Sequence, residues 1–174
     1  MFHLRLIAII AAMFAVLSVQ GCATPEVKPE KSQLEIREFQ SRTYETSDSK
    51  MVLKAMLNVL QDDGFIVKNA DADLGLLTAT KEVDVTDTSA QTWNNISLAL
   101  SGAPGRAYRK NSIIEASANI SGYGNQTKVR INFQKKVLDN KGGVMEVAPI
   151  TESLYYQAFF AKVDKGVFLQ KENL

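Results

Sequence analysis

The chain has 174 residues, about the size of one domain, and a hydrophobic content of 45%, as in an ordinary globular protein. Of its 20 basic residues only Arg5 precedes residue 22, whereas all 19 acidic residues follow it. The part beyond residue 21 is therefore formally neutral, and nucleic acid is not an expected partner.

The amino terminus has the pattern of a processed secretion signal. Residues 6–17 form an uncharged apolar run, shorter than the roughly 20 residues of a membrane-spanning helix but typical of a signal-peptide core. The sequence Val19-Gln20-Gly21-Cys22 then resembles the lipobox of bacterial lipoprotein precursors, although Gln20 is larger than the residue usual there. We expect residues 1–21 to be a signal peptide and Cys22 to carry acyl chains.

The resemblance also implies a location. In lipoproteins of double-membraned bacteria, Asp after the cysteine usually marks retention at the inner membrane, whereas this chain has Ala23. We therefore expect an outer-membrane lipoprotein whose domain faces the periplasm and whose membrane contact is the lipid on Cys22. Residues 22–33 are polar and contain Pro25 and Pro29, which predicts an extended tether that places the domain up to ~30 Å from the lipid.

Residues 34–174 alternate between strand and helix patterns. Residues 34–45 are rich in β-formers and predict an edge strand. A helix follows, capped by Asp48 or Ser49 and ended by Gly64. Its apolar residues recur at helical spacing and form one stripe: Val52, Ala55, Met56, Val59 and Leu60.

Four strands and a last helix complete the pattern. Residues 65–69 and 76–85 predict two strands, and residues 114–120 and 129–134 alternate as an antiparallel hairpin around a turn at 122–125. A further turn is expected at 139–143. The terminal helix, with Thr151 as its cap, has a second apolar stripe: Tyr156, Phe159, Phe160, Val163 and Val167. The predicted fold is α+β, a helix-grip-like antiparallel sheet packed against two helices.

Several short segments resemble the helix-grip domains of BamC, the lipoprotein subunit of the outer-membrane β-barrel assembly machinery. They are Val59-Leu60-Gln61, Gly64-Phe65-Ile66-Val67, Gly75-Leu76-Leu77-Thr78-Ala79-Thr80 and Tyr108-Arg109, within residues 50–170. BamC-like proteins have two such domains and a long unstructured segment, whereas this chain has one domain and a short tether. The resemblance therefore implies a fold and transfers no binding residue.

The most informative segment is an insert at about 86–106, which is longer than most connections between strands. Trp93, Ile96 and Leu100 would share one side of a short helix, and Arg106, Arg109 and Lys110 follow it. Under one interpretation the apolar side contacts a partner or the lipid interface, and the basic residues meet acidic groups. Under the other, the helix folds back on its own sheet and the basic residues are solvated.

Catalytic chemistry finds little support in this sequence. The only histidine is His3 and the only cysteine is Cys22, so a processed domain would lack the side chains of Ser-His-Asp, Cys-His and most zinc sites. The carboxylate pairs Asp62/Asp63 and Asp84/Asp87 are interpreted as solvated. We therefore expect no catalytic residue, no metal site and no cofactor.

Three classes of function stay open. The first is a lipid-anchored interaction module, an accessory subunit of an outer-membrane assembly or transport complex. The second is a periplasmic carrier of an apolar ligand such as a lipid, for which Ala116 and Ala118 would leave room beneath the helices, unless they simply let a helix pack closely. The third is a carboxylate-dependent hydrolase of the cell wall. The missing catalytic side chains favour the first.

Overall fold

The computed structural model describes residues 32–102 and 105–172. The predicted signal peptide, Cys22 and all but the end of the predicted tether lie outside the described residues. The elements in chain order are α2 (Gln33–Phe39), β1 (Ser41–Tyr44), α3 (Ser49–Asp62), β2 (Ile66–Asp71), β3 (Leu76–Asp84), α4 (Thr88–Ser101), β4 (Arg109–Tyr123), β5 (Gln126–Asp139), β6 (Val144–Pro149) and α5 (Ser153–Lys171). Within the described ranges no helix combines the length and apolarity needed to span a bilayer.

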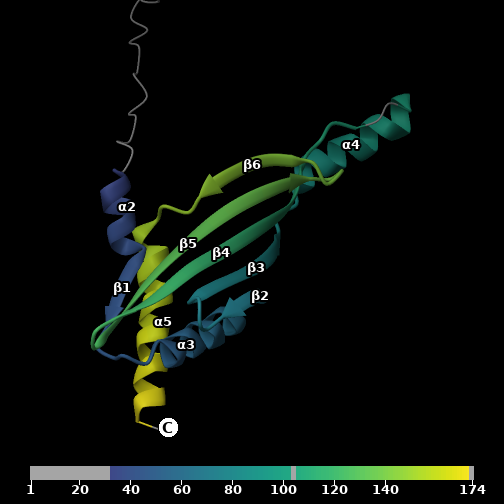
Figure 1. Cartoon of the computed structure of the whole chain (residues 1–174). Helices are drawn as coiled ribbons and strands as arrows, with labels where there is room; N and C mark the ends of the chain where they lie inside the picture. Colours follow the sequence, from purple (N-terminus) through teal and green to yellow (C-terminus); the bar gives the residue numbers. More distant parts are fainter. Residues whose placement is uncertain (1–31, 103–104, 173–174) are drawn as a thin grey trace, which may run out of the picture. The chain divides into compact units, whose positions relative to one another are not determined.

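The strands form one antiparallel sheet in the order β1-β5-β4-β3-β2, with β6 also paired to β5 (Figure 1). The prediction of an α+β fold with an antiparallel sheet is confirmed. The long hairpin of β4 and β5 is its centre, and its turn lies where the sequence predicts it. β6 was not predicted as a strand. It occupies the same side of β5 as β1, and pairs with residues 134–138 whereas β1 pairs with residues 127–130.

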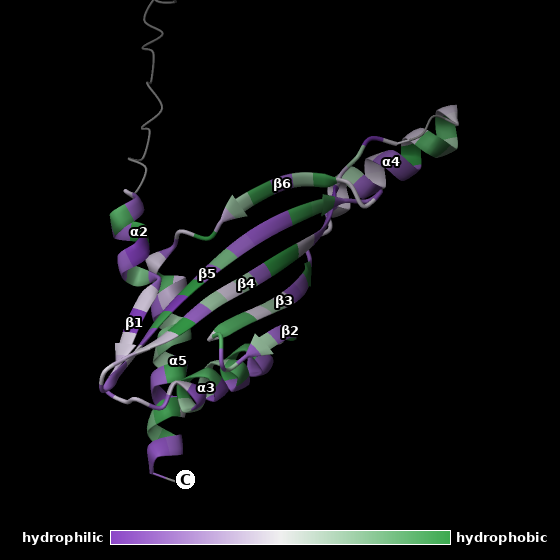
Figure 2. Ribbon diagram, in the orientation of Figure 1, coloured by the Kyte–Doolittle hydropathy of each residue, from purple (hydrophilic) through white to green (hydrophobic). Residues whose placement is uncertain are grey.

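The core lies between one face of this sheet and the helices α3 and α5. Both predicted apolar stripes are buried in it, so these two helices are confirmed. The alternation of hydrophobic and hydrophilic residues along β4 and β5 gives the sheet one apolar and one polar face (Figure 2). Ala116 and Ala118 belong to the apolar face and are buried in the core.

The hydroxyl of Tyr156 closes a gap in the sheet. Between β1 and β6 no strand pairs with β5, and Tyr156 is fully buried there. Its hydroxyl donates to the carbonyl oxygen of Ile150 at 2.9 Å and accepts from the backbone N–H of Phe133 at 3.2 Å. A tyrosine at this position therefore replaces part of the missing strand contact, in keeping with the rule that buried backbone groups find partners.

Three local predictions were wrong. Residues 33–39 form a helix, not a strand, because Ser32 caps it by accepting from the backbone N–H of Glu35 at 3.2 Å. Only Ser41–Tyr44 of the predicted edge strand is extended. The cap of α5 is Glu152 and not Thr151. Finally, Asp63 is not simply solvated, because its carboxylate accepts a hydrogen bond from Lys162 of α5.

Candidate interaction site

The insert between β3 and β4 forms the helix α4, and its ends follow from local hydrogen bonds. Asp84 accepts from the backbone N–H of Thr86 at 2.8 Å and from its hydroxyl, and these bonds lower the pKa of Asp84 below its ordinary value. Asp87 then caps the helix by accepting from the backbone N–H of Ala90 at 3.0 Å. Gly102 ends it in the left-handed conformation, with φ of 65°.

α4 is exposed over most of its length. None of its residues is buried, and the side chains of Trp93 and Leu100 are 70% and 83% exposed. In Figure 1 the helix extends beyond the end of the sheet that is opposite the β4–β5 turn. The alternative in which the insert packs back on its own sheet therefore does not describe this structure.

The chain returning from α4 is fixed to the helix by Asn94. The amide of Asn94 accepts from the backbone N–H of Arg106 at 3.0 Å and donates to the carbonyl oxygen of the same residue at 2.6 Å. Gly105 lies so close that a Cβ atom there would be 2.5 Å from Cγ of Asn94. This contact was not identified from the sequence. Its signal in the sequence is an asparagine on the helix followed, eleven residues later, by a glycine on the returning chain.

The Asn94 clamp leaves the predicted apolar side of α4 uncovered. At about 100° of rotation per residue, Trp93, Ile96 and Leu100 fall within about 60° of one another, whereas Asn94 is about 100–160° away from them. The sequence from residue 88 to residue 105 also contains no charged residue. A solvent-exposed helix usually has charges on its outer face, so an uncharged one with an exposed tryptophan is typical of a contact surface.

The predicted basic cluster is divided by the structure. Arg106 is exposed and lies where the chain leaves the Asn94 clamp. Arg109 instead makes an ion pair with Glu146 of β6, with Nη2 and Oε2 3.1 Å apart. Both partners are exposed, so this pair contributes at most about 1 kcal/mol to stability. Arg106, but not Arg109, is without an ion pair among the described residues.

A second exposed apolar group lies on β6, near the base of α4. Val144, Met145 and Val147 are each about half exposed or more. Two hydrogen bonds join this region to the segment after α4. The side-chain oxygen of Asn140 accepts from the backbone N–H of Tyr108 at 3.3 Å, and the backbone N–H of Asn140 donates to the carbonyl oxygen of Tyr108 at 3.0 Å. These β6 residues were missed because no strand was predicted there.

The carboxylates that the sequence singles out have structural contacts. Asp63 binds Lys162, Asp84 binds Thr86 and Asp87 caps α4. In the acidic turn after β2, Asp71 accepts from the backbone N–H groups of Asp73 and Leu74. The described ranges contain no group of three or more His, Cys, Asp or Glu side chains placed to hold a metal ion.

The hollows near the helices lie outside the core. An open groove of about 450 Å³ runs between α3 and α5 and is lined in part by Val59, Asp62 and Leu169. A smaller hollow of about 190 Å³ lies beside Phe65, Tyr155 and Lys162. Burial, and then the nearby charge of Asp63, raise the pKa of Tyr155 above its ordinary value. The space between sheet and helices that a carrier would use is filled by the buried side chains of the core.

No protein-family model matches the chain, and no curated protein matches it in sequence. Among solved structures, the chain is similar to a DUF4468 family protein from Bacteroides ovatus ATCC 8483. The two share 11% sequence identity, the similarity covers 73% of this chain and 84% of that chain, and the TM-score is 0.36.

Proposed function

We propose that this protein is a lipid-anchored interaction module of the bacterial envelope, an accessory subunit of an outer-membrane assembly or transport complex. In this proposal the lipid on Cys22 holds the chain to the membrane, and α4 is the element that contacts another protein of the complex. The domain acts by binding and performs no catalytic step.

The observation that carries the proposal is the character of α4. A helix of 14 residues that is uncharged and has no buried residue gains nothing from packing within its own domain. Its exposed tryptophan and leucine are residue types that supply binding energy once a partner surface covers them. Covering Trp93 and Leu100 would remove apolar surface from water at about 25 cal/mol per Å².

The anchor supports the same function by a separate argument. A protein fixed to a membrane meets its partners at a high effective concentration, so a small contact surface suffices for association. One exposed helix offers less area than the roughly 800 Å² per partner of a standard interface. The proposed lipid on Cys22 and the small contact surface on α4 are therefore complementary parts of one mechanism.

Site-specific photo-crosslinking in intact cells tests the contact. A photoreactive amino acid at position 100 of the full-length chain is expected to give one defined crosslink to an envelope protein. The matched control is position 154 on α5, since Leu154 is 76% exposed and close in exposure to Leu100. Equal crosslinking at both positions, or none at position 100, would contradict the proposed role of α4.

Affinity capture from detergent-solubilised membranes supplies the second readout. Trp93→Ala is expected to lose the co-purifying envelope protein, whereas Leu154→Ser retains it. The anchor is tested separately with labelled fatty acid, which the native chain should incorporate and a Cys22→Ser chain should not. Normal processing of Cys22→Ser without any labelled lipid on the native chain would remove the anchor from the proposal.

A further inference from the structure

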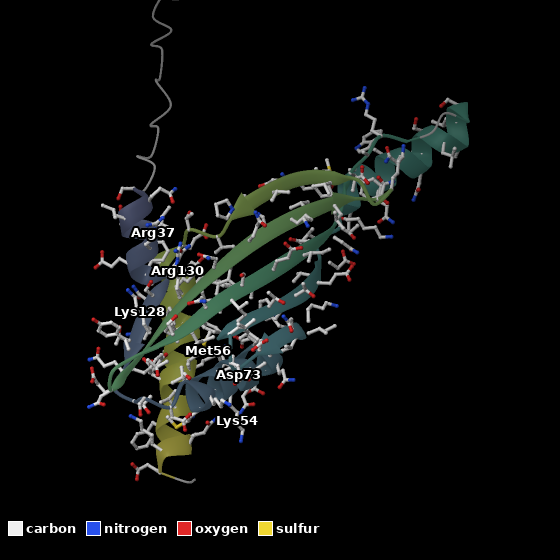
Figure 3. The ribbon with its side chains drawn as sticks, in the orientation of Figure 1. Arg37, Lys54, Met56, Asp73, Lys128 and Arg130 are labelled. Atoms are coloured by element: carbon white, nitrogen blue, oxygen red, sulfur yellow. The ribbon has the colours of Figure 1, made fainter. Side chains whose placement is uncertain are left out.

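Two basic side chains lie on the polar face of the sheet. Lys128 and Arg130 are two residues apart on β5, so both point away from the core residues Val129 and Ile131, which lie on the opposite face (Figure 3). Residues so spaced on a strand are about 7 Å apart along it. The two cations therefore form a pair on one surface.

The immediate cross-strand neighbours of this pair are uncharged. Lys128 is opposite Thr43 of β1 and Ser121 of β4, and Arg130 is opposite Ser41 and Asn119. Neither cation makes an ion pair or side-chain hydrogen bond within the described ranges. Several other basic residues do have carboxylate partners: Arg42, Lys50, Arg109, Lys136 and Lys162.

Several acids on the neighbouring elements have other hydrogen-bond partners. Glu45 accepts from the side-chain amide of Gln126 at 2.8 Å, and Asp71 serves the turn after β2. On α2, Glu35 and Glu38 flank Arg37. None of these carboxylates makes an ion pair with Lys128 or Arg130, so the two cations are free to contact an anion outside the domain.

An exposed tyrosine lies at the end of the same surface. Tyr123, at the β4–β5 turn, is 83% exposed. Together with Lys128, Thr43 and Gln126 it lines an open hollow of about 330 Å³. Tyrosine is enriched at the boundary between membrane and water, where its ring contacts lipid and its hydroxyl stays hydrated.

The position at which the chain enters the fold decides whether a membrane that holds Cys22 can reach this surface. α2 begins after Ser32 and leads directly into β1, whose Ser41 is paired with Arg130. Ser32 is the tenth residue after Cys22 in the sequence, and such a length of chain spans at most about 35 Å. A bilayer that holds lipid on Cys22 is therefore within reach of Lys128 and Arg130.

We infer that the polar face of the sheet near the β4–β5 turn binds the anionic phospholipid headgroups of the membrane to which the chain is anchored. Lys128 and Arg130 contact the headgroup phosphates, and Tyr123 enters the interface beside them. This inference rests on the proposed lipid anchor. It also separates the two proposed contacts, because α4 lies at the end of β4 that is opposite the β4–β5 turn (Figure 1).

The size of the effect follows from the surface potential of an anionic membrane. One cation near such a surface gains a factor of about five in binding, so the pair favours the bound orientation by about 30-fold. The attraction weakens as salt is added, since charges separated by more than about 10 Å are screened at an ionic strength of 0.1 M. Two cations are too few to anchor a free protein but suffice to orient a tethered one.

The test uses the acylated full chain reconstituted into vesicles of phosphatidylethanolamine, alone or mixed with phosphatidylglycerol. An environment-sensitive dye is attached to Gly122→Cys, a position where an added side chain meets open space. Acylation consumes the thiol of Cys22, so the introduced cysteine is the single reactive one. Dye quenching by a lipid-borne quencher reports contact between this surface and the bilayer.

Quenching should be several-fold stronger with phosphatidylglycerol than without it, and added salt should reverse the gain. Lys128→Glu/Arg130→Glu should remove the gain, whereas the control Lys54→Glu/Lys68→Glu, at two exposed lysines on α3 and β2, should keep it. Equal quenching in both vesicles, or a gain that survives Lys128→Glu/Arg130→Glu, would overturn the inference. A third outcome would also overturn the inference. If the dye were not quenched in vesicles but were shielded from solvent in native envelope membranes, a protein and not lipid would cover this face.

Failure of the anchor gives a different result. A chain that carries no fatty acid and stays outside both kinds of vesicle would contradict the proposed function and the inference together. A chain that enters both vesicles but shows no lipid-dependent quenching would contradict the inference alone.

Discussion

The two ends of the long β4–β5 hairpin differ in what covers them. Near the turn, α3 and α5 cover the apolar face, and residues such as Ile120, Val129 and Phe133 are buried. At the other end the chain extends into α4, which has no buried residue, and β6 leaves apolar side chains exposed. The same sheet thus has one end that stabilises the fold and one end that contributes little to it. At the end that contributes little, residues can serve in binding with the smallest cost to the stability of the fold.

The largest expected effect is at the covered end. Phe133 is 2% exposed, and its ring lies 4.9–6.0 Å from those of Phe65, Tyr155, Tyr156 and Phe159. Phe133→Ala should lower the free energy of unfolding by about 3–5 kcal/mol, since it removes a buried ring and leaves a cavity. Urea unfolding followed by circular dichroism measures this. A loss below about 1 kcal/mol would mean that the aromatic cluster does not hold the covered end together.

Two glycines with the same backbone conformation, one at each end, allow a more direct comparison of the two ends. Gly75 and Gly102 have φ of 64° and 65°. A Cβ atom on Gly75 would lie 1.9 Å from the carbonyl oxygen of Ile120, whereas one on Gly102 meets nothing within 4 Å. Gly75→Ala should cost about 2–4 kcal/mol of global stability through strain and overlap with β4.

Gly102→Ala has the same backbone strain without the overlap. Because α4 packs against no core residue, its strain of about 1–2 kcal/mol should fray the last turn of α4 and leave global unfolding nearly unchanged. Hydrogen exchange resolves the two outcomes residue by residue. Similar losses of global stability in both variants would show that α4 is coupled to the fold.

The third prediction concerns alkaline pH. Burial first, and then the negative charge of Asp164, raise the pKa of Tyr44 above its ordinary value of 10.0. The folded state therefore binds the proton more tightly than the unfolded state, so this contribution to stability is complete below pH 10 and is lost as the pH rises above it. At about one pH unit above 10.0, ionisation of Tyr44 in the unfolded state should have lowered the free energy of unfolding by about 1 kcal/mol.

Tyr44→Phe isolates this contribution, because the two proteins share every other titrating group. The difference in unfolding free energy between native protein and Tyr44→Phe should be constant up to pH 10 and should then shift in favour of the variant. A constant difference throughout the alkaline range would mean that Tyr44 titrates normally. Tyr44 lies on β1 and belongs to the core cluster, so this test reports on the covered end.

The sequence predicts the covered end well because its buried residues recur at regular spacing along the chain. The stripes of α3 and α5, the strand β3 and the β4–β5 hairpin all follow from apolar residues at helical or alternating spacing. Gln33–Phe39 escaped this reasoning because a serine cap, and not burial, decides its conformation. β6 escaped it because its apolar residues are exposed, although it pairs with the end of β5 directly across the predicted turn at 139–143.

The candidate site was located by sequence, but its environment was not. Trp93, Ile96 and Leu100 have the same spacing as the stripe of a buried helix, so periodicity alone does not distinguish an inward face from an outward one. The decision depends on whether the sheet has apolar area left to cover, and α3 and α5 already use that area. The absence of charge over residues 88–105 is the one local signal that separates α4 from an ordinary surface helix.

The smallest expected effect is at this exposed end, and it is the most discriminating. Trp93→Ala and Leu100→Ser should each change the free energy of unfolding by less than about 0.5 kcal/mol, since both side chains are mostly solvated in the isolated protein. Both variants should nevertheless lose the envelope partner, as expected of residues that contribute to binding and not to the stability of the fold. Thermal unfolding of the purified variants, beside capture from membranes, measures the two quantities independently. If either substitution destabilised the domain by 2 kcal/mol or more, α4 would be part of the core in solution, and the contrast between the two ends of the hairpin would not hold.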